Sequence, residues 1–193
     1  MKSKKTNDKS SYQVDVNGTK GWKNHKGQYH RLGGPAVEWN NGGKEWWING
    51  QRHREDGPAV ELANGYKEWW VNDLLHREDG PAVDDNGNIE YWVNGQRHRE
   101  DGPAVQSIND YKEWYINGQL HREDGPAVEL ANGHKEWWVN DLLHREDGPA
   151  VELANGHKEW YINNVEYQTE KEYWLKIYEM KLITKKELFL KLL

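Results

Sequence analysis

The feature that most constrains this chain is an eight-residue phrase, His-Arg-Glu-Asp-Gly-Pro-Ala-Val, that recurs along it. The phrase occurs five times and begins at His53, His76, His98, His121 and His144. A related phrase, His-Arg-Leu-Gly-Gly-Pro-Ala-Val, begins at His30, and successive copies lie 23, 23, 22, 23 and 23 residues apart. So regular a period predicts one small structural element stacked on itself. For function, it directs attention to the positions where the copies differ.

Each repeat also contains two adjacent aromatic residues, followed by Val or Ile and then Asn. The pairs are Trp46-Trp47, Trp69-Trp70, Tyr91-Trp92, Trp114-Tyr115, Trp137-Trp138 and Trp160-Tyr161. Because Trp, Tyr, Val and Ile suit a pleated, half-buried surface, we interpret 67–72 and its equivalents as one strand. The alternation of a strand places Trp69 and Val71 on one face and Glu68 and Trp70 on the other.

A second strand is predicted over 58–62, and Asn64-Gly65 between the two strands is a strong hairpin signal. Gly57 permits a positive φ, and Pro58 suits the start of a strand. The repeats therefore predict an all-β fold, in which stacked 23-residue β-hairpins form one elongated, twisted antiparallel sheet. The single 22-residue step falls at 84–87 and shortens a hairpin tip, where a deletion costs least.

The two ends of the chain depart from the repeat. Residues 1–11 are polar and predict a disordered tail, and 12–29 resemble a degraded repeat that caps the array. The hairpin repeats then occupy 30–167. Residues 168–193 predict a short α-helical C-terminal cap.

Two capping-box sequences support this helical cap. Thr169-Glu-Lys-Glu172 and Thr184-Lys-Lys-Glu187 predict helices over 170–182 and 185–193. Such helices would cover the open edge of the last hairpin. The alternative is a partner-binding or dimerising helix, because the Leu-rich end is more apolar than a cap requires.

Composition limits the partners. The formal net charge is −6 and the chain has no Cys, so basic-surface binding to nucleic acid or anionic membranes is disfavoured and disulfides are excluded. There is no apolar run typical of a signal peptide or a membrane span, which makes the cytoplasm the default expectation.

The repeated polar residues do not predict chemistry. Equivalent histidines in adjacent repeats stand roughly 10 Å apart, too far to share one zinc ion, so we expect no metal site. The Arg-Glu-Asp triplets recur in identical exposed copies, whereas acid–base catalysis needs one desolvated, asymmetric pocket. We therefore predict no catalytic residues and no cofactor. The triplets form either a ladder of turn-capping ion pairs or a charged binding stripe.

The second aromatic column is the first candidate for partner binding, because exposed aromatic rings stack on apolar side chains, sugars or bases. The alternative is that both aromatic columns are buried. A Lys two residues before five of the six aromatic pairs could support nucleic-acid contact, but the Glu that follows it would repel phosphate. These lysines are Lys44, Lys67, Lys112, Lys135 and Lys158. The candidates from this column are Trp70, Trp92, Tyr115 and Trp138.

The positions after the strand Asn vary between repeats, and exposed leucines on a turn there would suggest protein contact. These leucines are Leu74, Leu75, Leu142 and Leu143. The charged stripe adds Arg77, Glu78, Asp79, Arg99, Glu100 and Asp101.

The segment Trp-Val-Asn-Gly-Gln-Arg-His at 92–98 resembles the MORN repeat, whose unit of similar length reads roughly Trp-x-Asn-Gly-x-x-His-Gly. Here Arg-Glu-Asp-Gly-Pro replaces the shorter glycine motif after His. The chain looks more like the divergent Asn-Gly-x-x-His-Arg-Glu-Asp-Gly-Pro-Ala repeats of phage, giant-virus and bacterial mobile-element proteins. The resemblance covers about residues 30–165 and implies stacked β-hairpins.

For function, the resemblance implies a non-catalytic protein-binding module. Its viral association suggests a phage or mobile-element inhibitor of a host defence effector, similar to an anti-CRISPR protein that blocks an RNA-guided nuclease. The partner would then be a host or phage protein, including a ribonucleoprotein, and not a membrane. Alternatives are RNA or single-strand binding along the aromatic column, a scaffold, or an antitoxin-type repeat protein. The chain would be a monomer or a homodimer through its C-terminal helices.

Overall fold

The computed structural model describes residues 10–193. Fifteen strands form one antiparallel sheet in which spatial order follows sequence order, and two helices follow at the C-terminus. This confirms the predicted fold of repeated β-hairpins with a helical end. Residues 1–9 of the predicted tail lie outside the described residues, and the first strand begins at Ser11. The chain divides into two compact units, 1–96 and 97–193.

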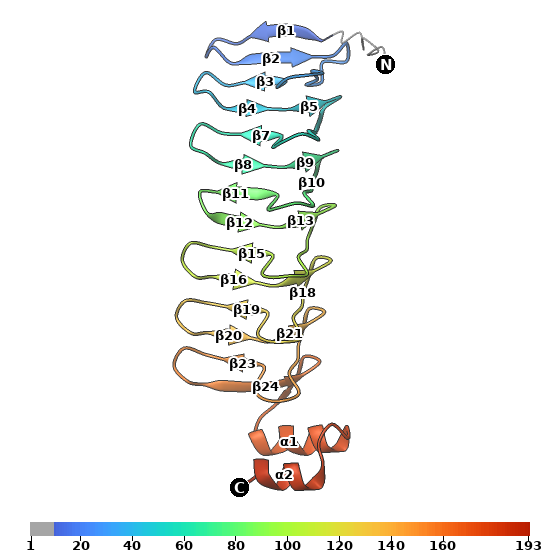
Figure 1. Cartoon of the computed structure of the whole chain (residues 1–193), viewed down its shortest axis with the longest axis vertical. Helices are drawn as coiled ribbons and strands as arrows, with labels where there is room; N and C mark the ends of the chain where they lie inside the picture. The colour runs from blue at the N-terminus through green and yellow to red at the C-terminus, as the bar shows by residue number, and fades with distance from the viewer. Residues whose placement is uncertain (1–9) are drawn as a thin grey trace. The chain divides into compact units, whose positions relative to one another are not determined.

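In the N-terminal unit, eight strands of the main sheet pair in sequence as hairpins (Figure 1). They are β1 (Ser11–Val14), β2 (Lys20–Lys23), β3 (Val37–Glu38), β4 (Lys44–Glu45), β7 (Val60–Glu61), β8 (Lys67–Glu68), β11 (Val83–Asp85) and β12 (Asn88–Glu90). The hairpin β1–β2 occupies the predicted degraded repeat.

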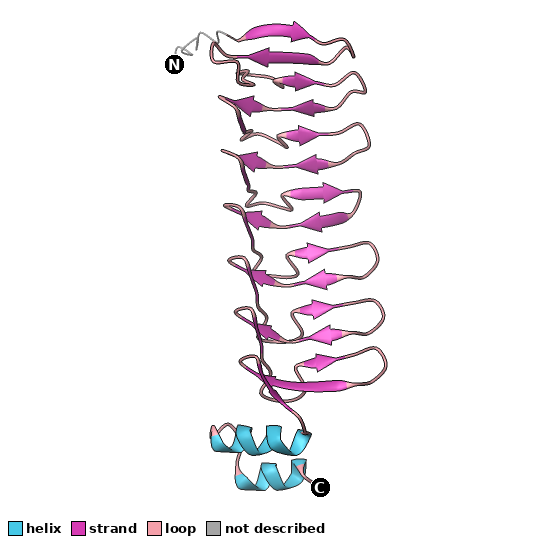
Figure 2. Cartoon of the chain, turned by 180° about the vertical axis from the view of Figure 1, so that it is seen from behind, coloured by secondary structure: helices cyan, strands magenta, loops and turns pink. Residues whose placement is uncertain are grey.

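The C-terminal unit continues the same pattern. Its main-sheet strands are β15 (Val105–Gln106), β16 (Lys112–Glu113), β19 (Val128–Glu129), β20 (Lys135–Glu136), β23 (Val151–Glu152), β24 (Lys158–Ile162) and β25 (Val165–Tyr167). Within each unit, the loops of the main hairpins lie at one end of the strands and a second set of small hairpins lies at the other (Figure 2).

These small hairpins correct the sequence interpretation, which placed one hairpin in each repeat. They are β5–β6 (Trp47–Ile48, Gln51–Arg52), β9–β10 (Trp70–Val71, Leu74–Leu75), β13–β14 (Trp92–Val93, Gln96–Arg97), β17–β18 (Tyr115–Ile116, Gln119–Leu120) and β21–β22 (Trp138–Val139, Leu142–Leu143). The prediction of one continuous strand over 67–72 is therefore wrong. The prediction that Leu74 and Leu75 stand on a turn is also wrong, because they form β10.

The predicted strand breaks at Trp69 because its neighbours in the main sheet end there. The Trp69 N–H still donates to the Ala82 carbonyl at 2.8 Å, but the Trp69 carbonyl accepts from the His76 N–H of its own repeat's return strand, and Pro81 has no N–H to continue the ladder. Beyond that point Trp70 and Val71 fold back on Leu75 and Leu74. A repeat thus contains a main hairpin and a small hairpin made from one aromatic segment.

The two hairpins of a repeat differ in the geometry of their turns. At the small hairpin Asn72 and Asp73 have φ of 51° and 62°, the two positive values of a type I′ turn. At the main tip only Gly65 is positive, at 95°, closing a three-residue loop. The shortened repeat replaces that loop by a two-residue turn at Asn86-Gly87, with φ of 52° and 98°. The missing residue is therefore at a hairpin tip, as the sequence predicted.

Within the hairpin repeats, the fully buried side chains are small. The Ala of every His-Arg-x-x-Gly-Pro-Ala-Val phrase is completely buried, and the following Val is buried in four of the repeats. Both aromatic columns are only half-buried. The repeats therefore pack around a narrow Ala and Val column, with the aromatic rings as its walls.

One face of the main sheet is a ladder of opposite charges. In the N-terminal unit Lys44 stands opposite Glu38 and Glu61, and in the C-terminal unit Lys135 stands opposite Glu129 and Glu152. Cross-strand pairs of opposite charge favour this register. These lysines face carboxylates of neighbouring strands.

The helices α1 (Glu170–Glu179) and α2 (Lys185–Lys191) are shorter than predicted. Lys181 has a φ of 61°, and the N–H groups of Lys181 and Leu182 donate to the Tyr178 and Ile177 carbonyls, which ends α1 early. Tyr173, Trp174 and Ile177 of α1 are buried with Ile162 of β24. The first helix therefore covers the last main hairpin.

Candidate binding surface at the repeat turns

The segment from His to Pro in each repeat, His53–Pro58 and its equivalents, forms a surface that we call the turn edge. Its Arg is structural. Arg54 donates to the Pro58 carbonyl at 3.0 Å, to Asp56 at 2.9 Å and to Glu61 at 2.9 Å. The guanidinium also stands 3.9 Å from the centre of the Trp46 ring, a cation–π contact.

The Gly of the turn is required by this Arg. A Cβ on Gly57 would lie 2.9 Å from the Arg54 guanidinium carbon, and the other four identical turns give 2.9–3.1 Å. The Arg therefore packs flat over the glycine backbone. This contact explains why Arg and Gly recur together three residues apart.

The His links one repeat to the next. In four repeats the backbone N–H of the strand Asn donates to the Nδ1 atom of the preceding repeat's His at 3.1–3.3 Å, joining Asn49 to His30, Asn72 to His53, Asn94 to His76 and Asn117 to His98. Among residues 10–193 no group of three or more His, Asp or Glu side chains could hold a metal ion.

The two acidic residues of the turn differ in what they contact. The hydrogen bond and charge of the neighbouring Arg lower the pKa of the Asp carboxyl in four turns, at Asp56, Asp79, Asp101 and Asp124. The Glu reaches only the His of its own turn, at 3.8–3.9 Å in the same four turns. Both side chains project outward, and Glu78 and Asp79 are 84% and 85% exposed.

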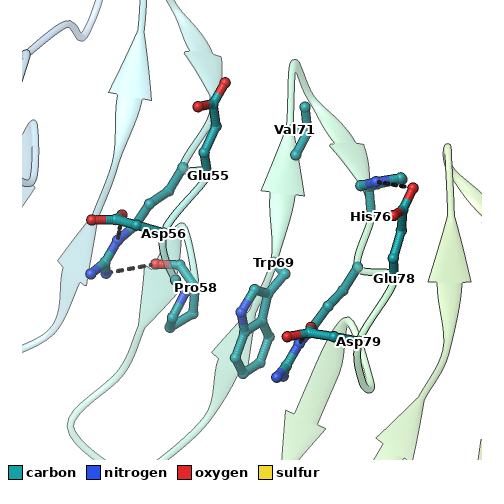
Figure 3. Close-up of a pocket in the computed structure, with 11 residues that line it drawn as sticks. Glu55, Asp56, Pro58, Trp69, Val71, His76, Glu78 and Asp79 are labelled. Carbon is teal, nitrogen blue, oxygen red and sulfur yellow. Dashed lines mark hydrogen bonds and ion pairs between the residues drawn. The ribbon is translucent and has the colours of Figure 1, made fainter.

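A groove lies between consecutive turns. The groove between the turns of Arg54 and Arg77 has a volume of about 710 Å³, with Trp69 and Val71 among its lining residues. Figure 3 shows Trp69 between the carboxylates of the two turns. Two more grooves with equivalent linings lie within the C-terminal unit, around Trp114 and Trp137.

The second aromatic column, predicted to bind a partner, is half-buried and engaged within its own strand. The indole N–H of Trp70 donates to Glu68 at 2.7 Å, and Trp92 and Trp138 donate to the equivalent Glu at 2.8 Å. Burial and the Glu113 charge raise the pKa of Tyr115. These rings therefore donate hydrogen bonds to half-buried carboxylates of the sheet.

The four predicted leucines divide into two pairs. Leu74 and Leu142 are 47% and 37% exposed. Leu75 and Leu143 are half-buried and stand opposite Trp70 and Trp138 across the small hairpins. Only the first leucine of each pair offers a substantial apolar surface.

The predicted stripe residues lie on the turns of two repeats, 77–79 in the N-terminal unit and 99–101 in the C-terminal unit, and they have unequal roles. Arg77 is stacked on Trp69 at 4.2 Å, whereas Glu78, Asp79, Glu100 and Asp101 are exposed. The groove lining by Trp69 and Val71 was missed, because the sequence argument sought binding rings in the other column. The strand alternation that pairs these two residues was the available signal.

A second contact was also missed. Asp73 accepts a hydrogen bond from the Arg52 N–H at 2.7 Å, and Asp141 and Asn164 make the same bond to Leu120 and Leu143. The corresponding residue is Gly in the other repeats, at Gly50, Gly95 and Gly118. The Asp-Leu-Leu variation thus includes a clamp between neighbouring repeats.

Comparison with models of known protein families finds no match, and comparison with curated protein sequences finds none either. No helix within residues 10–193 has the length and apolar character needed to cross a membrane.

Proposed function

We propose that this chain is a non-catalytic protein-binding repeat module whose partner lies along the turn edge and presents basic side chains to it. The supporting observation is the Glu of each turn. It is identical in five copies, it is highly exposed in four, and it takes no part in the Arg contacts that hold the turn. The hairpin tips, which are also exposed, keep Glu-Leu-Ala-Asn-Gly in three repeats and differ from it in the other three. Structural need alone therefore does not explain the repeated Glu.

The grooves have the chemistry for Lys or Arg. Such side chains combine an apolar stem with a cationic end, and the groove combines Trp69 and Val71 with four exposed carboxylates. Two strands per repeat advance the chain by roughly 10 Å, which equals about three residues of an extended peptide. Within either unit, a segment in the polyproline II conformation, which presents every third side chain on one face, would match successive grooves with a basic residue at every third position.

Several contacts favour a protein partner over RNA or single-stranded DNA. The exposed turn carboxylates repel phosphate, and the lysines of the main sheet stand opposite carboxylates. The second aromatic column, which would have to stack on bases, is half-buried and bonded to Glu. Nucleic-acid binding is therefore the less favoured function.

The more specific form of the proposal is inhibition of a host defence effector, such as an RNA-guided nuclease. It rests on the resemblance of the turn sequence to repeats of phage and mobile-element proteins. A nuclease that binds nucleic acid has basic surfaces, and an acidic edge is complementary to them. Its test is cleavage by such a nuclease with and without this chain, with Glu55→Gln/Glu78→Gln expected to restore cleavage.

The binding test uses two labelled peptides of equal composition. One has Lys at every third residue and the other has its lysines clustered, and fluorescence anisotropy measures both affinities over a range of salt. We expect the periodic peptide to bind several-fold more tightly, and Glu55→Gln/Glu78→Gln to weaken it. Glu166→Gln/Glu179→Gln, which removes the same charge outside the turns, is the matched control. Equal affinity for the two peptides contradicts the groove spacing, and tighter binding of a single-stranded oligonucleotide contradicts the protein-binding function.

A further inference from the structure

The second C-terminal helix and the residues after it present an apolar stripe that the other described residues, from 10 onward, leave exposed. Phe189, Leu190 and Leu193 are 64%, 61% and 87% exposed. Helical spacing places Phe189, Leu190 and Lys186 on one side of α2, and Leu193 follows the C-cap residue Leu192. Leu188, on the opposite side, packs against the buried cluster of α1 and β24. The stripe is thus the outward face of a helix whose inward face is already used.

Contacts within the chain contribute little to the stability of α2. None of the seven residues of α2 is fully buried, although a complete capping box between Thr184 and Glu187 begins it. Helices this short are marginal in water, and most of their stability comes from packing an apolar face. A contiguous exposed stripe of Phe and Leu marks an interaction surface.

The charged residues beside the stripe are placed so that they can pair with the same residues of a second copy. Glu187 and Lys191 lie on one flank, and Lys191 is held over the Trp174 ring at 4.3 Å. If two copies of α2 pack antiparallel about a two-fold axis, the same flanks face each other with their direction reversed. Glu187 of each copy then stands beside Lys191 of the other, and Phe189 packs near Leu190 across the axis.

From this pattern we propose that the stripe of α2 binds a second copy of this chain, forming an antiparallel two-fold dimer through Phe189, Leu190 and Leu193. The inference is independent of what the turn edge binds. A dimer presents two sets of turn edges to one partner or assembly, which raises the effective affinity when both can engage.

The first test is the oligomeric state of the full chain, measured by sedimentation equilibrium over a concentration series. We expect a monomer–dimer equilibrium that Leu190→Asp shifts at least tenfold toward monomer. Leu175→Asp, on an exposed position of α1, is the matched control and should leave the equilibrium unchanged. Glu187→Gln keeps the capping box, since Gln serves at that position, and should weaken the dimer several-fold. A wild-type chain that remains monomeric throughout overturns the proposal.

Cysteine cross-linking fixes the orientation, because the chain has no natural Cys. An equimolar mixture of Lys186→Cys and Leu193→Cys chains should form a mixed disulfide dimer on mild oxidation, since antiparallel packing brings these positions together. Each variant alone should cross-link poorly. Efficient cross-linking of each variant to itself, without the mixed product, indicates parallel packing and contradicts the proposed dimer.

Discussion

The two ends of each main hairpin differ in how much sequence variation they show between repeats. At the tips, the loop is closed by a Gly of positive φ in four repeats, by Asp110 in a fifth and by the two-residue Asn86-Gly87 turn in a sixth. At the turn edge, five copies keep the same six residues. The tip loops bond mainly to themselves, whereas each turn is held by one Arg that contacts a carbonyl, carboxylates and a ring. Variation is therefore tolerated where no single side chain carries the geometry.

Removing the Arg of a turn is expected to have the largest effect on the free energy of unfolding. Arg122→Ala loses the bonds to Asp124, to Glu129 and to the Pro126 carbonyl, and also the stack on Trp114. We expect a loss of about 3 kcal/mol in unfolding free energy, because charge-assisted bonds and cation–π contacts each contribute on the order of 1–2 kcal/mol. Urea unfolding followed by Trp fluorescence measures it. A loss no larger than that of Lys135→Ala, at the tip side of the main sheet, would mean that the Arg is dispensable.

A substitution at Gly125 that crowds the same Arg should lower the free energy of unfolding by less than the removal of Arg122 does. Gly125→Ala places a Cβ 2.9 Å from the Arg122 guanidinium carbon, so the side chain must shift from its bonds. Overpacking of this kind costs roughly 1–3 kcal/mol. In an Arg122→Ala background the same change should be neutral or slightly stabilising, since alanine also restricts the unfolded chain. An undiminished penalty in that background would show that the glycine is required for another reason.

Removing the hydrogen bond that joins two neighbouring repeats at Asp141 should lower the free energy of unfolding by a smaller amount. Asp141→Gly removes the hydrogen bond from the Leu120 N–H, at 2.7 Å, and reproduces the residue present at Gly118. We expect a loss of about 1 kcal/mol, the usual contribution of such a bond. Asp141→Asn should be nearly neutral, because Asn164 makes the same bond in the last repeat. Equal losses for Gly and Asn would show that charge, and not the hydrogen bond, matters.

The period, the main hairpins and the C-terminal helices followed from the sequence because each has a local signal. The aromatic segment, the Asn-Gly tip and the Thr-x-x-Glu boxes all act over a few residues. The break at Trp69 had no such signal. It depends on Pro81, which lies in the next repeat and ends the ladder by lacking an N–H.

The features of the candidate site were likewise predictable only where a local sequence signal exists. The exposure of Glu78 and Asp79 follows from their place in a polar turn. The contact of Arg77 with Trp69 joins residues eight apart that pack only after both hairpins have formed. The groove that Trp69 lines depends on the spacing of two consecutive turns. No pattern within one repeat contains that information.

The smallest expected effect tests the tolerance of the tips directly. Deleting Ala131 leaves Glu129-Leu130-Asn132-Gly133, which has the same length and the same Asn-Gly pair as Asp84-Asp85-Asn86-Gly87 of the shortened repeat. The three-residue loop should become a two-residue type I′ turn, because Asn and Gly both accept a positive φ. We expect a change of less than about 0.5 kcal/mol, as for a surface change that disturbs no buried contact. Deleting Glu123 from the turn edge also removes one exposed residue, but it shifts Asp124 and Gly125 relative to Arg122 and should cost several times more. Equal costs at the two ends would contradict the distinction between a self-contained loop and a turn held by one arginine.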